Sequence, residues 1–73
     1  MREKKEIAFK DILSAILKEN GLTQTQFAGA IGVKQSQVSE WLKGKAKPGY
    51  DTLRSILLAF EDLSAEYLLG LEE

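Results

Sequence analysis

Apolar residues recur every three or four positions along most of this chain, which is the spacing that places side chains on one face of an α-helix. The first such segment covers residues 7–19, and it is followed by Asn20 and Gly21, residue types that commonly end helices. The expected inward stripe consists of Ile7, Ala8, Ile12, Ala15 and Ile16, with Phe9, Leu13 and Leu17 on its flank.

A second, shorter helix is predicted from Gln24 to Ile31. Thr23 is a suitable N-cap, because its hydroxyl can accept a hydrogen bond from a free N–H group of the first turn. Leu22 before the cap and Phe27 at the fourth helical position are placed to form a hydrophobic staple. The start of this helix is therefore well defined by local signals alone.

A third helix is predicted over residues 35–43, and its spacing from the second helix is informative. If Gln24 is counted as position one, Ala28 is fifth, Gly32 ninth and Val38 fifteenth. A small fifth residue lets two helices cross closely, and a glycine at the ninth can take the left-handed conformation that ends the first of them. The fifteenth residue then turns back toward that helix. This spacing is typical of a helix-turn-helix.

The third helix has one apolar face and one polar face. Trp41 and Leu42 follow Val38 at three and four residues, so we expect Trp41 to be a core residue and not a platform for stacking bases. Gly44 ends the helix, and Lys34 stands at the cap position where serine or threonine would be expected. Amides, hydroxyls and charges remain outward and can contact base edges and phosphates. The outward residues are Lys34, Gln35, Ser36, Ser39, Glu40 and Lys43.

The remainder of the chain predicts two further helices after a loop. Pro48 prevents a helix from continuing through residues 45–49. A fourth helix is expected over residues 50–60, and Ser64 caps a short fifth helix that ends before Gly70. The fold class is therefore all-α, with five helices in a single domain over residues 1–73.

The net charge of -1 hides an uneven distribution of charge along the chain. Residues 1–33 sum to +1, residues 34–54 to +3 and residues 61–73 to -5. A bound phosphate responds to the local field and not to the total. The basic excess lies on the third helix and the loop after it, as expected for a surface that meets nucleic acid.

Several classes of function are disfavoured by what the sequence lacks. The chain has no cysteine and no histidine, so we expect no disulfide, metal, cofactor or acid/base pair, and hence no enzyme. No apolar run approaches the roughly 20 residues of a membrane span. We expect a soluble cytoplasmic protein with no membrane partner and no evident pocket for a small-molecule ligand.

The segment from Leu22 to Gly70 resembles the Cro/C1-type helix-turn-helix family, also called XRE-type, to which the lambda repressor DNA-binding domain belongs. The resemblance is carried by LTQTQFAGAIGV, SQVSEWLKGKAKP, DTLRSILLAF and SAEYLLG. Two features depart from the family pattern: Lys34 replaces the usual capping hydroxyl, and the link over residues 61–63 is one residue longer than the commonest form. The implied fold is a compact five-helix, lambda repressor-like domain.

The resemblance also implies roles for individual residues. Gln24 matches a glutamine that donates to a phosphate and braces the start of the third helix, the recognition helix. Gln35 and Ser36 match positions that commonly read bases, and Ser39 and Glu40, one turn later, can reach the same groove. Further phosphate contacts are expected from Lys34, Gln37, Lys43, Lys45 and Lys47.

Three readings of function remain open. The first is a transcriptional regulator, a repressor by preference, that binds double-stranded DNA as a homodimer on a near-palindromic operator. The second is an antitoxin of the same fold, with residues 61–73 contacting a protein partner. The third is a helical interaction module that does not bind DNA. The expected dimer contact, which could instead be core, consists of Tyr67, Leu68, Leu69 and Leu71.

Overall fold

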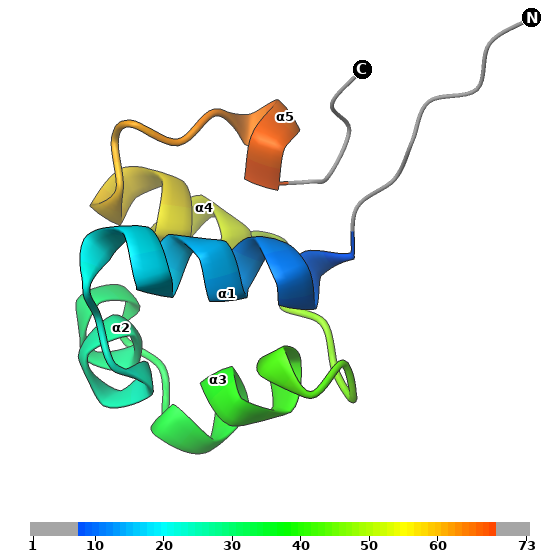
Figure 1. Cartoon of the computed structure of the whole chain (residues 1–73). Helices are drawn as coiled ribbons and strands as arrows, with labels where there is room; N and C mark the ends of the chain where they lie inside the picture. The colour runs from blue at the N-terminus through cyan, green and yellow to red at the C-terminus, as the bar shows by residue number, and fades with distance from the viewer. Residues whose placement is uncertain (1–7, 69–73) are drawn as a thin grey trace, which may run out of the picture.

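The computed structural model describes residues 8–68, which form five α-helices and no strand (Figure 1). The all-α, five-helix fold class predicted from the sequence is confirmed. The helices are α1 (Phe9–Asn20), α2 (Gln24–Ile31), α3 (Gln35–Leu42), α4 (Tyr50–Ala59) and α5 (Ala65–Leu68).

The helix α1 lies at the centre of the molecule, with α2 and α3 on one side and α4 and α5 on the other (Figure 1). It packs against α3 and α5, while α2 packs against α3 and α4. The pair α2 and α3 thus packs on α1 and α4, and the opposite side of α3 is left uncovered. No helix of residues 8–68 is long and apolar enough to cross a membrane.

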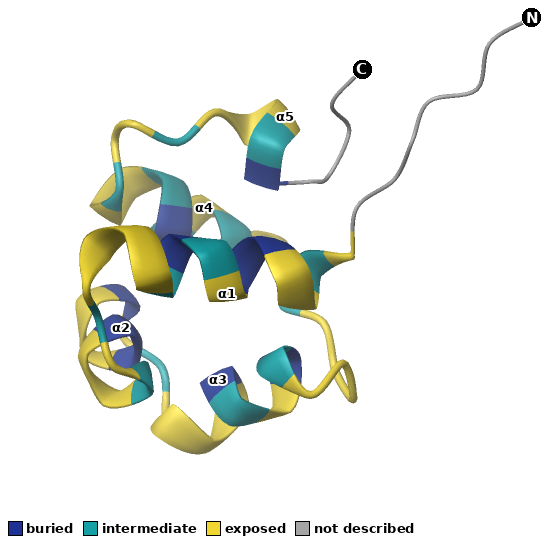
Figure 2. Ribbon diagram, in the orientation of Figure 1, coloured by how far each residue is buried: buried dark blue, intermediate teal, exposed yellow. Residues whose placement is uncertain are grey.

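The buried face of α1 differs from the stripe predicted for it (Figure 2). Leu13 was expected on the flank, but it is completely buried together with Ile12 and Ile16. Ala8 was expected inside, but it is exposed and precedes the helix, and Ala15 is only half-buried. Because α1 contacts neighbours on two sides, its buried face is wider than a single stripe and is centred nearer Leu13.

The capping signals at the start of α2 and α5 form as the sequence predicts. The Thr23 hydroxyl accepts from the N–H of Gln26 (3.1 Å), and the Gln26 side chain accepts from the N–H of Thr23 (2.9 Å). This reciprocal pair is a capping box, which satisfies two N–H groups that the helix itself cannot. At α5, the Ser64 hydroxyl accepts from the N–H of Tyr67 (3.0 Å).

The helix α4 ends at Ala59, one residue before the predicted end, because the backbone of Phe60 turns out of the helix. Phe60 leaves the helical conformation (φ -123°, ψ 84°) and stacks on the buried ring of Phe27, with ring centroids 5.4 Å apart and planes 17° apart. The contact joins α4 to α2 across the core and gains aromatic packing beyond simple burial.

The C-terminal apolar residues were expected to form either a dimer contact or core. Leu68 is 1% exposed and belongs to the core of a single chain, so its side chain has no free surface for a second copy. Tyr67 is half-buried against the same core. Leu69 and Leu71 lie outside the described residues.

Candidate nucleic-acid interface

The turn between α2 and α3 is made by a left-handed glycine. Gly32 has φ 78°, and the N–H groups of Gly32 and Val33 both donate to the carbonyl oxygen of Ala28, at 2.9 and 3.0 Å. The small side chain of Ala28 is buried where α2 packs against α3. These contacts fix the angle at which α2 and α3 cross, although only three residues separate the two helices.

The inward face of α3 carries the predicted apolar residues. Val38 is completely buried, Trp41 is 4% exposed and Leu42 is half-buried. The Trp41 ring meets the ring of Phe9 edge to face, with centroids 6.2 Å apart and planes 83° apart. Trp41 therefore fastens α3 to α1 and presents no face on which a base could stack.

The outward face of α3 is polar along its whole length. Ser36, Glu40 and Lys43 are exposed and follow one another at four and three residues, so they share one side of the helix. Gln35 is exposed at the start of the helix, and Ser39 is half-buried at the edge of this face. All four residues predicted to read bases lie on α3, and Ser39 has the least free surface among them.

A hydrogen bond joins the first residues of α2 and α3. The Nε2 group of Gln35 donates to Oε1 of Gln24, at 2.5 Å. Among the described residues, neither N–H of the Gln24 amide donates a hydrogen bond. Gln35 likewise keeps its Oε1 acceptor and one N–H donor for other partners. One amide is therefore free to donate to a phosphate, while the other keeps an acceptor and a donor for a base edge.

The start of α3 is capped in an unusual way because Lys34 replaces a hydroxyl. The Lys34 side chain makes no capping hydrogen bond, but the Gln37 side chain accepts from the Lys34 N–H at 3.1 Å. One half of a capping box is thus present without the other. The ammonium group of Lys34 is left exposed at the positive end of the helix, next to the predicted base-reading residues.

The predicted lysines after α3 are exposed on a loop that closes the helix. Gly44 is left-handed (φ 76°), and the N–H of Lys45 donates to the carbonyl oxygen of Glu40 at 3.0 Å. Lys43, Lys45 and Lys47 alternate along this loop with small residues. Alternation with small residues leaves the side chains of all three lysines accessible to solvent.

Lys10 on α1 is a further cation beside this loop, and the sequence analysis did not identify it. A Cβ atom built on Gly44 would lie 3.3 Å from Cδ of Lys10, so the lysine stem packs directly on the turn. No sequence signal could reveal this proximity, because Lys10 and the loop are brought together only by the packing of α1 on α3.

Charge is segregated across the fold. Among residues 8–68, the lysines at the two ends of α3 and in the loop after it lie on one side, whereas Glu61, Asp62 and Glu66 belong to the link before α5 and to α5 itself, on the opposite side of α1 (Figure 1). Such a distribution orients an approaching polyanion toward α3. Among residues 8–68, no group of three or more histidine, cysteine or acidic side chains is placed to hold a metal ion.

Two short helices joined by a left-handed glycine, within a five-helix all-α fold, define a lambda repressor-like helix-turn-helix domain. The helix-turn-helix family model matches residues 13–68, and the chain belongs to this family, which is of the Cro/C1 type. A comparison with curated proteins gave no match. Among solved structures, the chain is similar to the crystal structure of a transcriptional regulator from Listeria innocua, with 29% sequence identity and a TM-score of 0.81. The similarity covers 94% of this chain and 64% of that regulator.

Proposed function

We propose that this chain binds double-stranded DNA sequence-specifically and acts as a transcriptional regulator, with α3 in the major groove. The observation that carries the proposal is the uncovered polar face of α3, which begins at a hydrogen-bonded pair of glutamines and ends at a cluster of lysines. An ordinary solvent-facing helix requires neither feature. Family membership and the similarity to a transcriptional regulator support the same conclusion.

Sequence would be read by the exposed residues at the start and middle of α3. The free acceptor and donor of the Gln35 amide match the N6 and N7 groups of adenine. Ser36 can donate or accept, and Glu40 can accept from N4 of cytosine. Ser39, at the edge of the face, would contribute a smaller contact because it is half-buried.

Affinity without sequence information would come from contacts with the DNA backbone. Gln24 can donate its free N–H groups to a phosphate while its Oε1 holds Gln35 in place. Lysine contacts release counterions, so binding should weaken steeply with salt. The proposed backbone contacts are Gln24, Lys34, Gln37, Lys43, Lys45 and Lys47, with Lys10 added from the structure.

The regulator would act as a homodimer that represses transcription by occupying a near-palindromic operator. Two copies of α3 would enter successive major grooves about 34 Å apart. Since Leu68 is buried, we propose Leu58 of α4, which is 68% exposed, as one contact between the two copies and Tyr67 as another. Leu58→Lys and Tyr67→Lys should each lower the dimer fraction in sedimentation, and a dimer unaffected by both would refute this choice of contacts.

A selection from a random double-stranded DNA library tests the function directly. The protein is incubated with the library at near-physiological salt, and the retained DNA is sequenced. We expect a two-fold symmetric motif with half-sites about one helical turn apart. A variant with Gln35→Ala and Ser36→Ala, which keeps every lysine, should retain DNA without enriching the same motif. No enrichment by the unmodified protein would contradict the proposal.

A further inference from the structure

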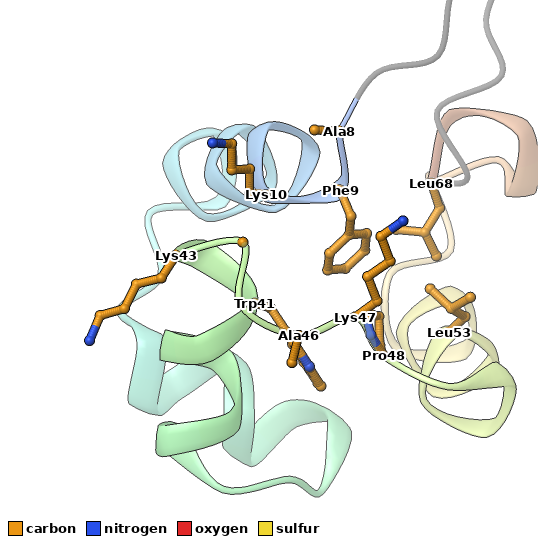
Figure 3. Close-up of a pocket in the computed structure, with 11 residues that line it drawn as sticks. Ala8, Phe9, Lys10, Trp41, Lys43, Ala46, Lys47, Pro48, Leu53 and Leu68 are labelled. Carbon is orange, nitrogen blue, oxygen red and sulfur yellow. The ribbon is translucent and has the colours of Figure 1, made fainter.

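A cavity of about 500 Å³ opens on the side of the molecule where the start of α1, the end of α3, the loop after α3 and α5 meet (Figure 3). No feature of the sequence predicted it. Apolar and aromatic side chains line it together with Lys10, Lys43 and Lys47, and none of the described lining residues is acidic. The residues that matter here are Phe9, Trp41, Leu53, Leu68, Lys10 and Lys47.

Lys47 differs from the other lysines of the cavity in its direction. Its side chain extends between Phe9 and Leu68, whereas those of Lys10 and Lys43 point away from the centre (Figure 3). Lysine stems commonly cover apolar surface in this way while the ammonium group stays hydrated. Among the three lysines of the described lining, Lys47 is thus the one whose side chain lies across the apolar residues of the cavity.

We propose that this cavity binds an organic anion that has a compact apolar body and one carboxylate, such as a medium-chain fatty acid. The apolar body would lie against the partly exposed side chains of Phe9, Pro48 and Leu53, beside Trp41, and the carboxylate would pair with the Lys47 ammonium. Pockets for small molecules are generally built in this manner, from apolar walls and few oriented polar groups. The positive charge of Lys47 beside these apolar side chains favours an anion over a cation or a neutral ligand.

Occupancy of the cavity would weaken DNA binding, a second step that rests on the proposed function. Lys47 is one of the proposed phosphate contacts, and a carboxylate that pairs with it competes with a phosphate for the same charge. The coupling is reciprocal, so DNA would lower the affinity for the anion by the same factor. The chain would then carry its own sensor for a metabolite acid, beside the surface that meets DNA.

Trp41 reports on the cavity without any DNA, because it lines the cavity and is the single tryptophan of the chain. The test follows its fluorescence emission during titration with octanoate or, separately, with 1-octanol. We expect a saturable change with both, and an affinity for octanoate about three- to fivefold higher, as one partly exposed ion pair allows. Lys47→Met keeps the stem and removes the charge, and it should abolish the preference for octanoate.

Lys45→Met is the matched control, because Lys45 lies on the same loop but does not line the cavity. It should leave octanoate binding unchanged. Equal affinities for octanoate and 1-octanol, or a preference that survives Lys47→Met, would overturn the assignment. So would the absence of a saturable change in the full chain. If octanoate bound only after removal of residues 1–7 or 69–73, the removed residues would be the occupant of the cavity in the full chain, and the proposal would be wrong.

The effect on DNA is measured separately, by anisotropy of a labelled operator with and without saturating octanoate. We expect about a fivefold loss of DNA affinity, within the usual range of coupling between sites. An unchanged DNA affinity despite a positive Trp41 titration would refute the regulatory step alone. Failure to bind any DNA would refute the proposed function, while the Trp41 titration would still test whether the cavity binds octanoate.

Discussion

The hydrogen bond between Gln24 and Gln35 makes a quantitative prediction about the DNA complex. We expect the effects of Gln24→Ala and Gln35→Ala on DNA affinity to be coupled. Gln24 would donate to a phosphate and would also position Gln35. The loss of either amide therefore also removes part of the other amide's contribution to DNA affinity.

The magnitudes follow from the groups involved. Gln24→Ala removes a hydrogen bond to a charged phosphate and should cost about 1.5–3 kcal/mol. Gln35→Ala removes a base contact and should cost about 1–3 kcal/mol. The bond between the two amides contributes about 1 kcal/mol, so the double variant should lose about 1 kcal/mol less than the sum of the single losses. That difference is about fivefold in the dissociation constant.

The assay is a double-mutant cycle, measured by fluorescence anisotropy on the selected operator at one fixed salt concentration. Thermal unfolding followed by circular dichroism shows whether the variants remain folded. We expect the free energy of unfolding to fall by no more than about 1 kcal/mol, the contribution of the bond between the amides, because neither amide belongs to the core. Thr25→Ala provides a matched control. Thr25 is exposed on the same turn of α2 and makes no side-chain hydrogen bond within residues 8–68, so its cycle with Gln35→Ala should be additive.

Strictly additive losses for Gln24→Ala and Gln35→Ala would refute the idea that one amide positions the other. The pattern over operator variants is a second criterion. Gln35→Ala should relax the choice of one base pair, whereas Gln24→Ala should weaken binding to all sequences. A Gln24→Ala variant that lost affinity only for one base pair would show that Gln24 reads a base.

Three further predictions concern charge and capping. Lys45→Ala should weaken binding to specific and random DNA alike and reduce the slope of log affinity against log salt by about 0.9, measured by anisotropy over a salt series; an unchanged slope would exclude a phosphate contact. Glu40→Gln should raise affinity for random DNA, because it removes an anion from the exposed face of α3, and the same titration would contradict this if random-DNA affinity fell. Thr23→Ala removes the α2 cap and should lower the free energy of unfolding by about 0.5–2 kcal/mol in urea denaturation, whereas Thr25→Ala should leave it nearly unchanged.

Local signals in the sequence were sufficient for the elements that form the proposed DNA-binding surface. The bounds of α2 agree with the prediction at both ends, because Thr23 and Gly32 each act through hydrogen bonds within a few residues. The inward face of α3 was also predicted, since Val38 and Trp41 lie on one helical stripe. The family resemblance located the residues for base and backbone contacts, and their roles stay predictions.

Which side chains meet across the fold depends on how the helices pack and could not be predicted from the sequence. Leu13 is core and not flank because α1 has neighbours on two sides, and Phe60 leaves α4 because its ring stacks on Phe27. The approach of Lys10 to Gly44 and the cavity beside Lys47 likewise depend on how α1, α3 and α5 are placed. Caps and stripes are local properties of a helix and can be read along the chain, whereas contacts between distant residues depend on the angles at which helices cross.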